Sequence, residues 1–451
     1  MKKIIGYFIL LSGIMLQLSC KKQLEERPDK HLVIPQHLSD LQAILDYTPQ
    51  MMVDPGVSES SSDNYYISDI DYSGLEAETD RRIYSWAPDH QFETPVSDWG
   101  IAYTKVYNAN IVLDAIASIP ITPANEKEWK AIKGQALFIR SWSFWQVANI
   151  WALAYDSSTA SQDAGIPLRL NADFNEKSFR SSVQDTYNQI IKDLEDAISL
   201  LPNVALSKVR PSKPTVYGFI SRVYLSMRRY HKAEVYADSS LQLFSTLIDY
   251  NDLNPLADYP FTPLNEESLF YSTSGPILIY PYYYAKIDTV LYGQYANDDL
   301  RKNVFFADNG TGEITFKGSY AAYEGLFSGI ATDELFLNKA ECLARKGDIS
   351  EAMDKLNTLL FKRYKTGTFI PLTALNETEA LQTILKERRK ELIMRFTRWM
   401  DIKRLNKDGA GIILKRFING QTYILPPNDL RYAMALPEDV LSISGMKQNP
   451  R

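Results

Sequence analysis

One helix–turn–helix pattern occurs twice in the chain at a constant offset of 119 residues, and it constrains the fold more than any other feature. In each copy, a large residue is followed by a turn residue, a second large residue and a small alanine. The matched pairs are Tyr224 with Leu343, Arg228 with Gly347, Tyr230 with Ile349, Ala233 with Ala352, Ala237 with Leu356 and Leu241 with Leu360. This spacing is typical of a tetratricopeptide hairpin, in which the alanine lets the second helix approach the first closely. The pattern predicts a mainly α-helical repeat scaffold.

Repeat hairpins bury their apolar faces by stacking on neighbouring helices, so two copies this far apart should need other helices between them. Apolar residues at steps of three and four predict further helices over about 98–118, 128–154, 182–201 and 377–406. The first of them carries Asn110 on its apolar stripe, and a buried amide there must find hydrogen-bond partners. The scaffold is therefore expected over about 98–250 and 326–406.

Three other parts of the chain break the helical pattern. Residues 50–97, 251–325 and 409–451 are rich in proline, glycine, tyrosine or short polar residues and have no sustained helical period. They predict long loops with short strands, laid over one side of the scaffold. Loops of this length inside a compact domain are usually functional.

The first twenty residues predict export. Lys2 and Lys3 precede an apolar run from Ile4 to Leu16, which is too short to span a membrane and is typical of a secretory signal. Ser19 followed by Cys20 indicates cleavage after residue 19, with Cys20 as the acylated residue of a lipoprotein. The alternative is an ordinary signal peptide with a chance cysteine.

The remaining composition excludes some functions. The formal net charge is −6, and an acidic chain of this kind is not expected to bind nucleic acid. If Cys20 carries lipid, Cys342 is the only thiol left, so no internal disulfide can form. Cys342 lies in the middle of a predicted helix, which indicates a buried, unreactive thiol.

Six motifs in chain order resemble those of the SusD/RagB family. They are Trp99-x3-Tyr103-x2-Val106-x2-Ala109-Asn110; Gly134-Gln135-Ala136-Leu137 with Gly165-Ile166-Pro167; Ser182-Val183-x-Asp185-x-Tyr187; Thr332-Asp333-Glu334-Leu335 through Gly347; Glu387-Arg388-x2-Glu391 with Arg398-Trp399; and Lys447-Gln448-Asn449-Pro450. Gln135 stands where the family usually has glutamate.

The resemblance implies a SusD-like fold in which residues 20–451 form a single domain built on tetratricopeptide-type helices, with the ligand on a loop-rich side with short strands. It also implies a lipid-anchored protein on the outside of the outer membrane, partnered with a TonB-dependent, SusC-like transporter. In such a pair the lipoprotein acts as a hinged lid that captures oligosaccharide, or peptide in RagB-like members, and delivers it for uptake.

The chain shows no residues arranged for catalysis. The four histidines have no metal-ligand spacing, and no nucleotide-binding or nucleophile motif is present, so neither metal nor cofactor is expected. Glu387 and Glu391 share a helix face, as an inverting glycosidase pair could, but the basic residues around them indicate that they are solvated or ion-paired instead. A surface glycoside hydrolase and a repeat scaffold without a small ligand are therefore the alternatives to a binding protein.

Candidate ligand contacts come from the aromatic residues of the loops. Sugars present flat C–H faces and outward hydroxyls, so a site for them needs aromatic planes beside amide or carboxylate groups. Trp86 is the leading candidate, because it lies in the loop ahead of the first repeat helix, where the resemblance to the family implies binding aromatic residues. The full set is Asp63, Asn64, Tyr65, Tyr66, Trp86, Tyr282, Tyr283 and Tyr292. Packing between helices is the competing explanation for each of these aromatic residues.

Overall fold

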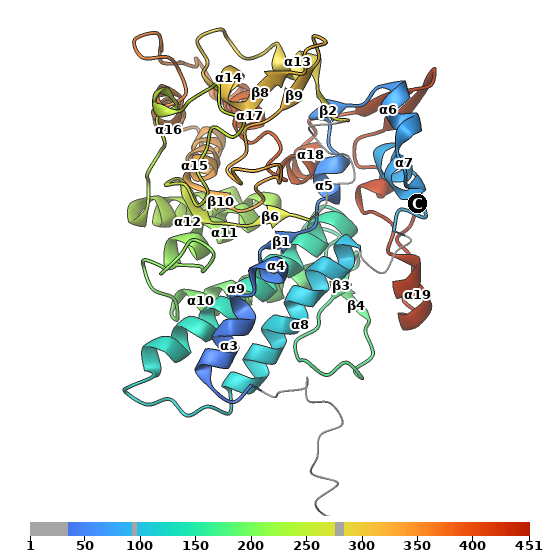
Figure 1. Ribbon diagram of the computed structural model, residues 1–451, viewed down its shortest axis with the longest axis vertical. Coiled ribbons are helices and arrows are strands. Elements are labelled where there is room, and N and C mark those ends of the chain that lie inside the picture. Colours follow the sequence, from blue (N-terminus) through green and yellow to red (C-terminus); the bar gives the residue numbers. More distant parts are fainter. Residues whose placement is uncertain (1–34, 93–96, 276–283) are drawn as a thin grey trace, which may run out of the picture.

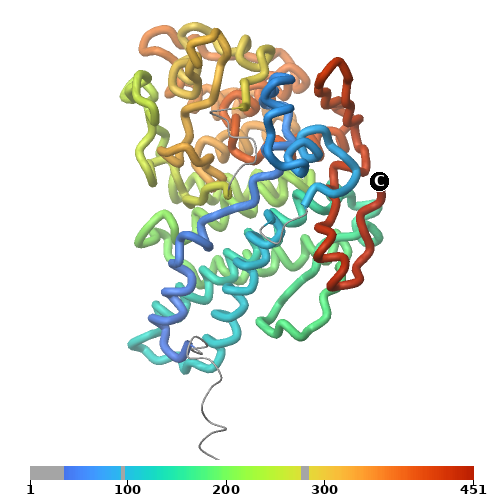
Figure 2. The backbone as a smooth tube through the Cα atoms, turned by 45° about the vertical axis from the view of Figure 1, so that its right-hand side comes forward, coloured from blue at the N-terminus to red at the C-terminus, as the bar shows by residue number. Residues whose placement is uncertain are grey.

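The computed structural model describes residues 35–92, 97–275 and 284–451. Its main body is a succession of antiparallel helices, each packed on the next, as Figures 1 and 2 show. These helices are α8 (Asp98–Ile116), α9 (Glu126–Trp151), α10 (Val183–Ile198), α11 (Lys213–Ser226), α12 (Tyr230–Leu243), α15 (Thr332–Lys346), α16 (Ile349–Phe361) and α17 (Glu377–Glu391). The predicted mainly helical fold class is confirmed.

The loop-rich parts cover one side and one end of this body. Their short helices are α3 (Leu38–Leu45), α4 (Thr48–Met51), α5 (Val57–Ser60), α6 (Asp69–Gly74), α7 (Glu78–Tyr84), α13 (Thr289–Tyr292), α14 (Arg301–Phe305), α18 (Arg398–Lys407) and α19 (Glu438–Ser444). Their strands form two-stranded pairs: β1 (Val53–Asp54) with β6 (Thr273–Ser274), β2 (Tyr65–Tyr66) with β7 (Lys286–Ile287), β5 (Ser268–Phe270) with β10 (Ile330–Ala331), β8 (Phe306–Asp308) with β9 (Ile314–Phe316), and β11 (Leu414–Ile418) with β12 (Gln421–Leu425). A further pair, β3 (Ala164–Pro167) with β4 (Arg180–Ser182), lies between α9 and α10.

The amide of Asn110 finds the partners that its burial requires. Its Nδ2 donates to the carbonyls of Arg169 and Asn171 at 2.8 and 3.0 Å, and its Oδ1 accepts from Arg140 at 3.0 Å. Arg140 in turn binds Asp193 on α10 with two hydrogen bonds of 2.8 and 2.7 Å. The polar residue on the apolar stripe therefore ties α8, α9 and α10 together.

Among the residues described, no helix is long and apolar enough to cross a membrane.

The two repeat hairpins recognised in the sequence stack directly on each other, so the expectation that other helices lie between them is wrong. Helix α12 packs on α15, and the intervening residues leave the helical body and return to it. The strand pair β5–β10 closes this excursion, because Phe270 lies opposite Ile330. Backbone pairing across the base of the inserted segment thus brings the second hairpin back to the first.

The predicted helix over 377–406 is interrupted. Between α17 and α18 the backbone takes left-handed values at Met394 (φ 55°) and Phe396 (φ 60°). This turn directs the Phe396 amide to Glu59 Oε2 at 3.0 Å, and it directs Arg395 to Asp333, also at 3.0 Å. Polar contacts with distant residues therefore override the local helical pattern here.

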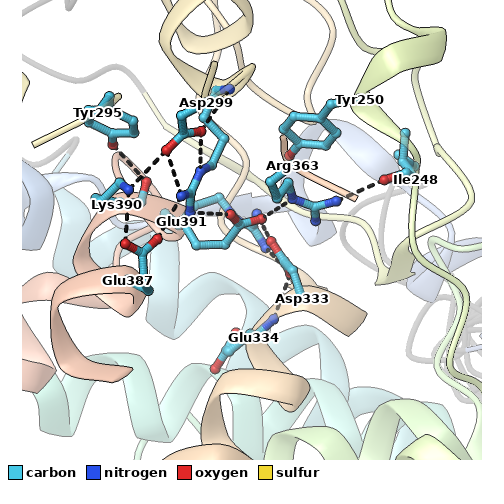
Figure 3. A network of polar contacts seen from close by, with 12 residues as sticks. Ile248, Tyr250, Tyr295, Asp299, Asp333, Glu334, Arg363, Glu387, Lys390 and Glu391 are labelled. Carbon is cyan, nitrogen blue, oxygen red and sulfur yellow. Dashed lines mark hydrogen bonds and ion pairs between the residues drawn. The ribbon is translucent and has the colours of Figure 1, made fainter. Parts of the chain in front are cut away.

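A buried network of charged groups joins the loop-rich part to α17, as Figure 3 shows. Arg363 donates to Glu391 at 2.7 Å and to Glu267 at 2.8 Å, while Arg301 donates to Glu391 at 3.0 Å. Arg301 also binds Asp299 and Glu387, and Lys390 binds the same two carboxylates. Removing one partner from such a network costs about 3–5 kcal/mol, because the remaining charge is left buried and unpaired.

The turns of the two repeat hairpins have the same backbone geometry. Arg228 and Gly347 occupy the matched positions, with φ values of 60° and 88°. Each turn is closed by two matching backbone hydrogen bonds of 2.9–3.0 Å. In the first turn Arg228 N donates to Leu225 O and Arg229 N to Tyr224 O, and in the second Gly347 N donates to Ala344 O and Asp348 N to Leu343 O. The predicted repeat alignment is thereby confirmed, and only the second copy carries the glycine that favours this conformation.

We expect Arg228→Gly to be more stable than Arg228→Ala by about 1 kcal/mol, since glycine adopts a left-handed φ without the steric cost that alanine meets. Both variants lose the arginine side chain, so their difference isolates the backbone. The free energies of unfolding from urea titrations would measure it. Equal stabilities would show that the turn does not hold this φ in solution.

A second prediction concerns Lys403 on α18. Its ammonium donates to the carbonyls of Asn149 and Ala152 at 2.6 and 2.7 Å, at the end of α9, and burial lowers its pKa to about 7. The unfolded chain therefore binds a proton that the folded chain lacks between pH 7 and pH 10.5. Stability should rise with pH in this range, by up to about 1.4 kcal/mol per pH unit, and it should fall as the pH approaches 7.

The measurement is urea unfolding between pH 7 and pH 9 for the parent chain and for Lys403→Met. The variant loses the titrating group, so the slope of its stability against pH should be lower by about 1.4 kcal/mol per pH unit. Other titrating groups contribute equally to both proteins and cancel in the comparison. Parallel slopes would mean that the buried lysine stays protonated throughout.

Candidate functional site

Two aromatic residues predicted to contact ligand pack around one buried arginine. Trp86 and Tyr65 are 2% and 3% exposed. The guanidinium carbon of Arg416 lies 5.1 and 5.0 Å from their ring centres. The indole of Trp86 donates to the Ser61 carbonyl at 3.0 Å, and the hydroxyl of Tyr65 donates to the Ser60 carbonyl. In this conformation neither ring has an open face on which a sugar could stack.

Asp63 and Asn64 belong to the same packed region. Asp63 accepts two hydrogen bonds from Arg398 at 2.6 and 2.8 Å and pairs with Arg389 at 3.2 Å. Burial alone would raise the pKa of Asp63, but these guanidiniums hold it well below its ordinary value. Asn64 is buried and donates to Glu59 at 2.7 Å. Asp63 therefore holds the 59–66 segment against α17 and α18, while Asn64 bonds within that segment.

The remaining predicted contacts differ in how they are placed. Tyr66 is 37% exposed, so its ring can reach a ligand. Tyr292 is half-buried in α13, edge-on to Phe306 with ring centres 5.3 Å apart, and packs against the same hydrophobic cluster as Tyr65. Tyr282 and Tyr283 lie outside the described residues, as does Cys20.

A surface pocket of about 250 Å³ lies where the loop-rich part meets the first repeat helix. Helix α4 and strands β1 and β6 approach the N-terminal half of α8 at this place in Figure 1. The lining residues are Pro49, Gln50, Val53, Ser97, Gly100, Ile101 and Thr104. Segments from two distant parts of the chain therefore form the walls, and none of the seven side chains is ionisable.

Two polar groups in this pocket are free to bind a ligand. Gln50 is exposed, and its Oε1 accepts from Asn108 at 3.2 Å, which orients the amide. Its Nε2 and the hydroxyl of exposed Thr104 have no hydrogen-bond partner within the described part of the chain. Val53 and Ile101 supply apolar surface between them. The pocket therefore combines apolar contact with hydrogen-bonding groups whose capacity is unused.

A fixed tyrosine ring stands one strand away from the pocket. Tyr323 is 46% exposed, and its hydroxyl bonds to Thr273 Oγ1 at 3.0 Å. Thr273 lies directly opposite Val53 in the β1–β6 pair, so the two side chains are neighbours about 5 Å apart. The ring also rests on Gly325, where an added Cβ would come within 2.4 Å of it. An aromatic plane held in this way suits stacking on a sugar face.

A larger groove, of about 590 Å³, runs along α8 between the β3–β4 loop and α19. Most of its polar groups are already bonded, since Tyr103 donates to the Pro167 carbonyl at 2.8 Å and both ends of the Asn110 amide are occupied. Its most exposed side chains are apolar, such as Phe174 at 81%. The smaller pocket has no ionisable lining residue and keeps two uncharged polar groups free, and for this reason we take it as the candidate site for an oligosaccharide.

The groups considered for catalysis are all held in structural contacts. Glu387 and Glu391 are buried and ion-paired with the distant Arg301 and Arg363, so of the two alternatives the ion-paired one is confirmed and the solvated one is wrong. Cys342 is buried, and burial raises the pKa of its thiol, so it is unreactive as expected. No group of three or more His, Cys, Asp or Glu side chains that could hold a metal ion occurs in residues 35–92, 97–275 and 284–451.

Comparison with known proteins agrees with this reading. A SusD-like family model, described as starch-binding and associating with the outer membrane, matches residues 22–225, and the SusD family model matches residues 333–438. The SusD-like protein P38 of Formosa agariphila is 23% identical over 387 residues, which cover 70% of this chain and 73% of that protein.

Solved structures share the fold. A putative sugar-binding protein from Bacteroides vulgatus aligns with a TM-score of 0.75 and 20% identity, over 93% of this chain and 99% of that one. A laminarin-binding SusD-like protein aligns with a TM-score of 0.64 and 16% identity, over 91% of this chain and 98% of that one. The chain belongs to the SusD/RagB family, an outer-membrane-associated family of glycan-binding proteins and not of enzymes.

Proposed function

We propose that this chain is a lipid-anchored protein of the outer cell surface that captures oligosaccharide and delivers it to a TonB-dependent, SusC-like transporter. One observation carries the choice of site, namely a pocket in which the free groups of Gln50 and Thr104 lie beside apolar surface, with the fixed ring of Tyr323 one strand away. Aromatic planes beside free hydrogen-bonding groups are what a sugar requires. The laminarin-binding relative of the same fold supports a glycan as ligand.

Oligosaccharide is favoured over peptide because of the groups at this pocket. A peptide brings charged termini and side chains, which are recognised by ionic partners. The lining residues offer hydroxyls, an amide and apolar surface, but no charge. Tyr66 and Tyr292, both predicted from the sequence, remain proposed additional contacts. Trp86, Tyr65, Asp63 and Asn64 are proposed to hold the adjoining loop in place. Tyr282 and Tyr283 stay predictions.

Replacing Tyr323 or Gln50 with alanine should weaken oligosaccharide binding without unfolding the protein. A stacked aromatic contact contributes about 0.5–1.5 kcal/mol beyond its buried area, so Tyr323→Ala should raise Kd about two- to tenfold. A panel of soluble polysaccharides would first be screened by affinity electrophoresis, and calorimetry would then measure the variants on whatever binds.

Tyr107→Ala is the matched control, because Tyr107 is a comparably exposed tyrosine that lines the larger groove. Its Kd should equal that of the parent chain. If Tyr107→Ala loses affinity while Tyr323→Ala and Gln50→Ala keep it, the ligand binds in the larger groove and our choice of pocket is wrong.

Cys20→Ala should release the protein from the outer membrane, since lipid on Cys20 is proposed as its anchor. Cell fractionation and labelling of intact cells would follow the protein. Cys342→Ala is the control, because the chain has two cysteines and the second is buried. A Cys20→Ala variant that stays membrane-bound and surface-labelled would rule out lipid anchoring.

A further inference from the structure

The proposed pocket is assembled from chain segments that contain no lysine or arginine. The lining residues between Pro49 and Val53 lie within residues 31–80, and those between Ser97 and Thr104 lie within residues 83–104. Of the neighbouring residues, Thr273 lies within residues 233–285 and Tyr323 within residues 318–338. None of these four segments has a cationic side chain, although the chain carries 49 lysines and arginines in 451 residues. Lysine and arginine are absent from the complete sequence of each segment.

The cation that follows these segments on α8 is neutralised inside the protein. Lys105 is 1% exposed, and its ammonium is bound to the carboxylate of Asp54. Asp54 also accepts from Trp142 Nε1 at 3.1 Å and from Ser328 Oγ at 2.7 Å. Lys105 is therefore committed to the core beneath β1 and cannot reach a ligand.

Two carboxylates lie beside residues of the pocket, and Arg210, which lies near the start of α4, is already paired with Asp46. Asp98 follows Ser97, and its carboxylate accepts from the backbone amides of Gly56 and Val57 at 3.0 Å each. Burial raises the pKa of Asp98 to about 6, so the group is mostly ionised at pH 7. Glu324 is exposed next to Tyr323. Both carboxylates would repel a negatively charged polymer.

We propose that the glycan captured here is uncharged, which excludes uronate-rich and sulfated polysaccharides as ligands. The proposal rests on the function proposed above and narrows it. Carboxylate and sulfate groups on a glycan are bound by arginine or lysine through charge-assisted hydrogen bonds. Without such partners they would lose hydration and gain nothing in return. The free groups of Gln50 and Thr104 match the hydroxyls of a neutral sugar.

The test compares each neutral polysaccharide with a copy that differs only in charge. Laminarin, amylose and other soluble neutral glucans and mannans would be used beside derivatives whose primary hydroxyls are oxidised to carboxylates. Alginate and carrageenan would serve as natural anionic probes. Calorimetry at 50 and 500 mM NaCl should find a neutral polymer that binds with a Kd unchanged within about twofold, because no ionic contact is screened. Oxidation of that polymer should weaken binding at least tenfold.

A charge variant separates this inference from the function on which it rests. Thr104→Lys places a cation at the pocket on an exposed helical position and should recover several-fold affinity for the oxidised polymer. Tyr107→Lys, on the same helix but in the larger groove, should not. If an anionic polymer binds the parent chain more tightly than its neutral counterpart, with affinity that falls as salt rises, the glycan is charged and only this inference fails. If no polymer of either kind binds, the proposed function fails and this inference with it.

Discussion

Buried ion pairs between arginines and carboxylates hold the loop-rich part of this protein against its helical body. Arg363 links Glu391 on α17 to Glu267, which directly precedes β5. Strand β5 leads within a few residues to β6, and β6 pairs with β1 at the pocket. Each arginine is fully buried, so its charge is tolerated only while every partner is present. The position of the pocket wall therefore depends on charges that lie far from any ligand.

The pocket itself is a product of long-range pairing. Val53 and Thr273 are opposite each other although some 220 residues separate them in the chain. The excursion between α12 and α15 is closed by β5–β10, and this closure carries both Thr273 and Tyr323 to the start of α8. The side of the pocket formed by α8 is held in place, because α8 packs against the other repeat helices of the body. The loops contribute its walls and its aromatic plane.

The tyrosines show why the exposure of a side chain is harder to predict from sequence than the fold. A tyrosine can bury its ring if a carbonyl accepts its hydroxyl proton, as Ser60 does for Tyr65, or it can expose the ring while a neighbour holds the hydroxyl, as Thr273 does for Tyr323. The two environments look alike in sequence, since both residues lie in polar, irregular segments. Trp86 is likewise buried by Arg416, a cation 330 residues away in the chain. No local signal singled out Gln50, Thr104 or Tyr323.

By itself, the sequence determined the repeat scaffold. The helical spacing and the alanine contacts of a hairpin involve residues close together in the chain, so they can be recognised without knowing the tertiary structure. It also determined that Asn110, if buried, must find hydrogen-bond partners, that Glu387 and Glu391 have basic neighbours unsuited to a catalytic pair, and that the segments around the pocket lack cations. Only the tertiary structure decided that the two hairpins touch, where the helix after Glu391 breaks, and which aromatic rings are exposed. Those outcomes depend on partners hundreds of residues apart, such as Glu59 with Phe396 and Arg416 with Trp86, whose pairing is set by the packing of the whole chain.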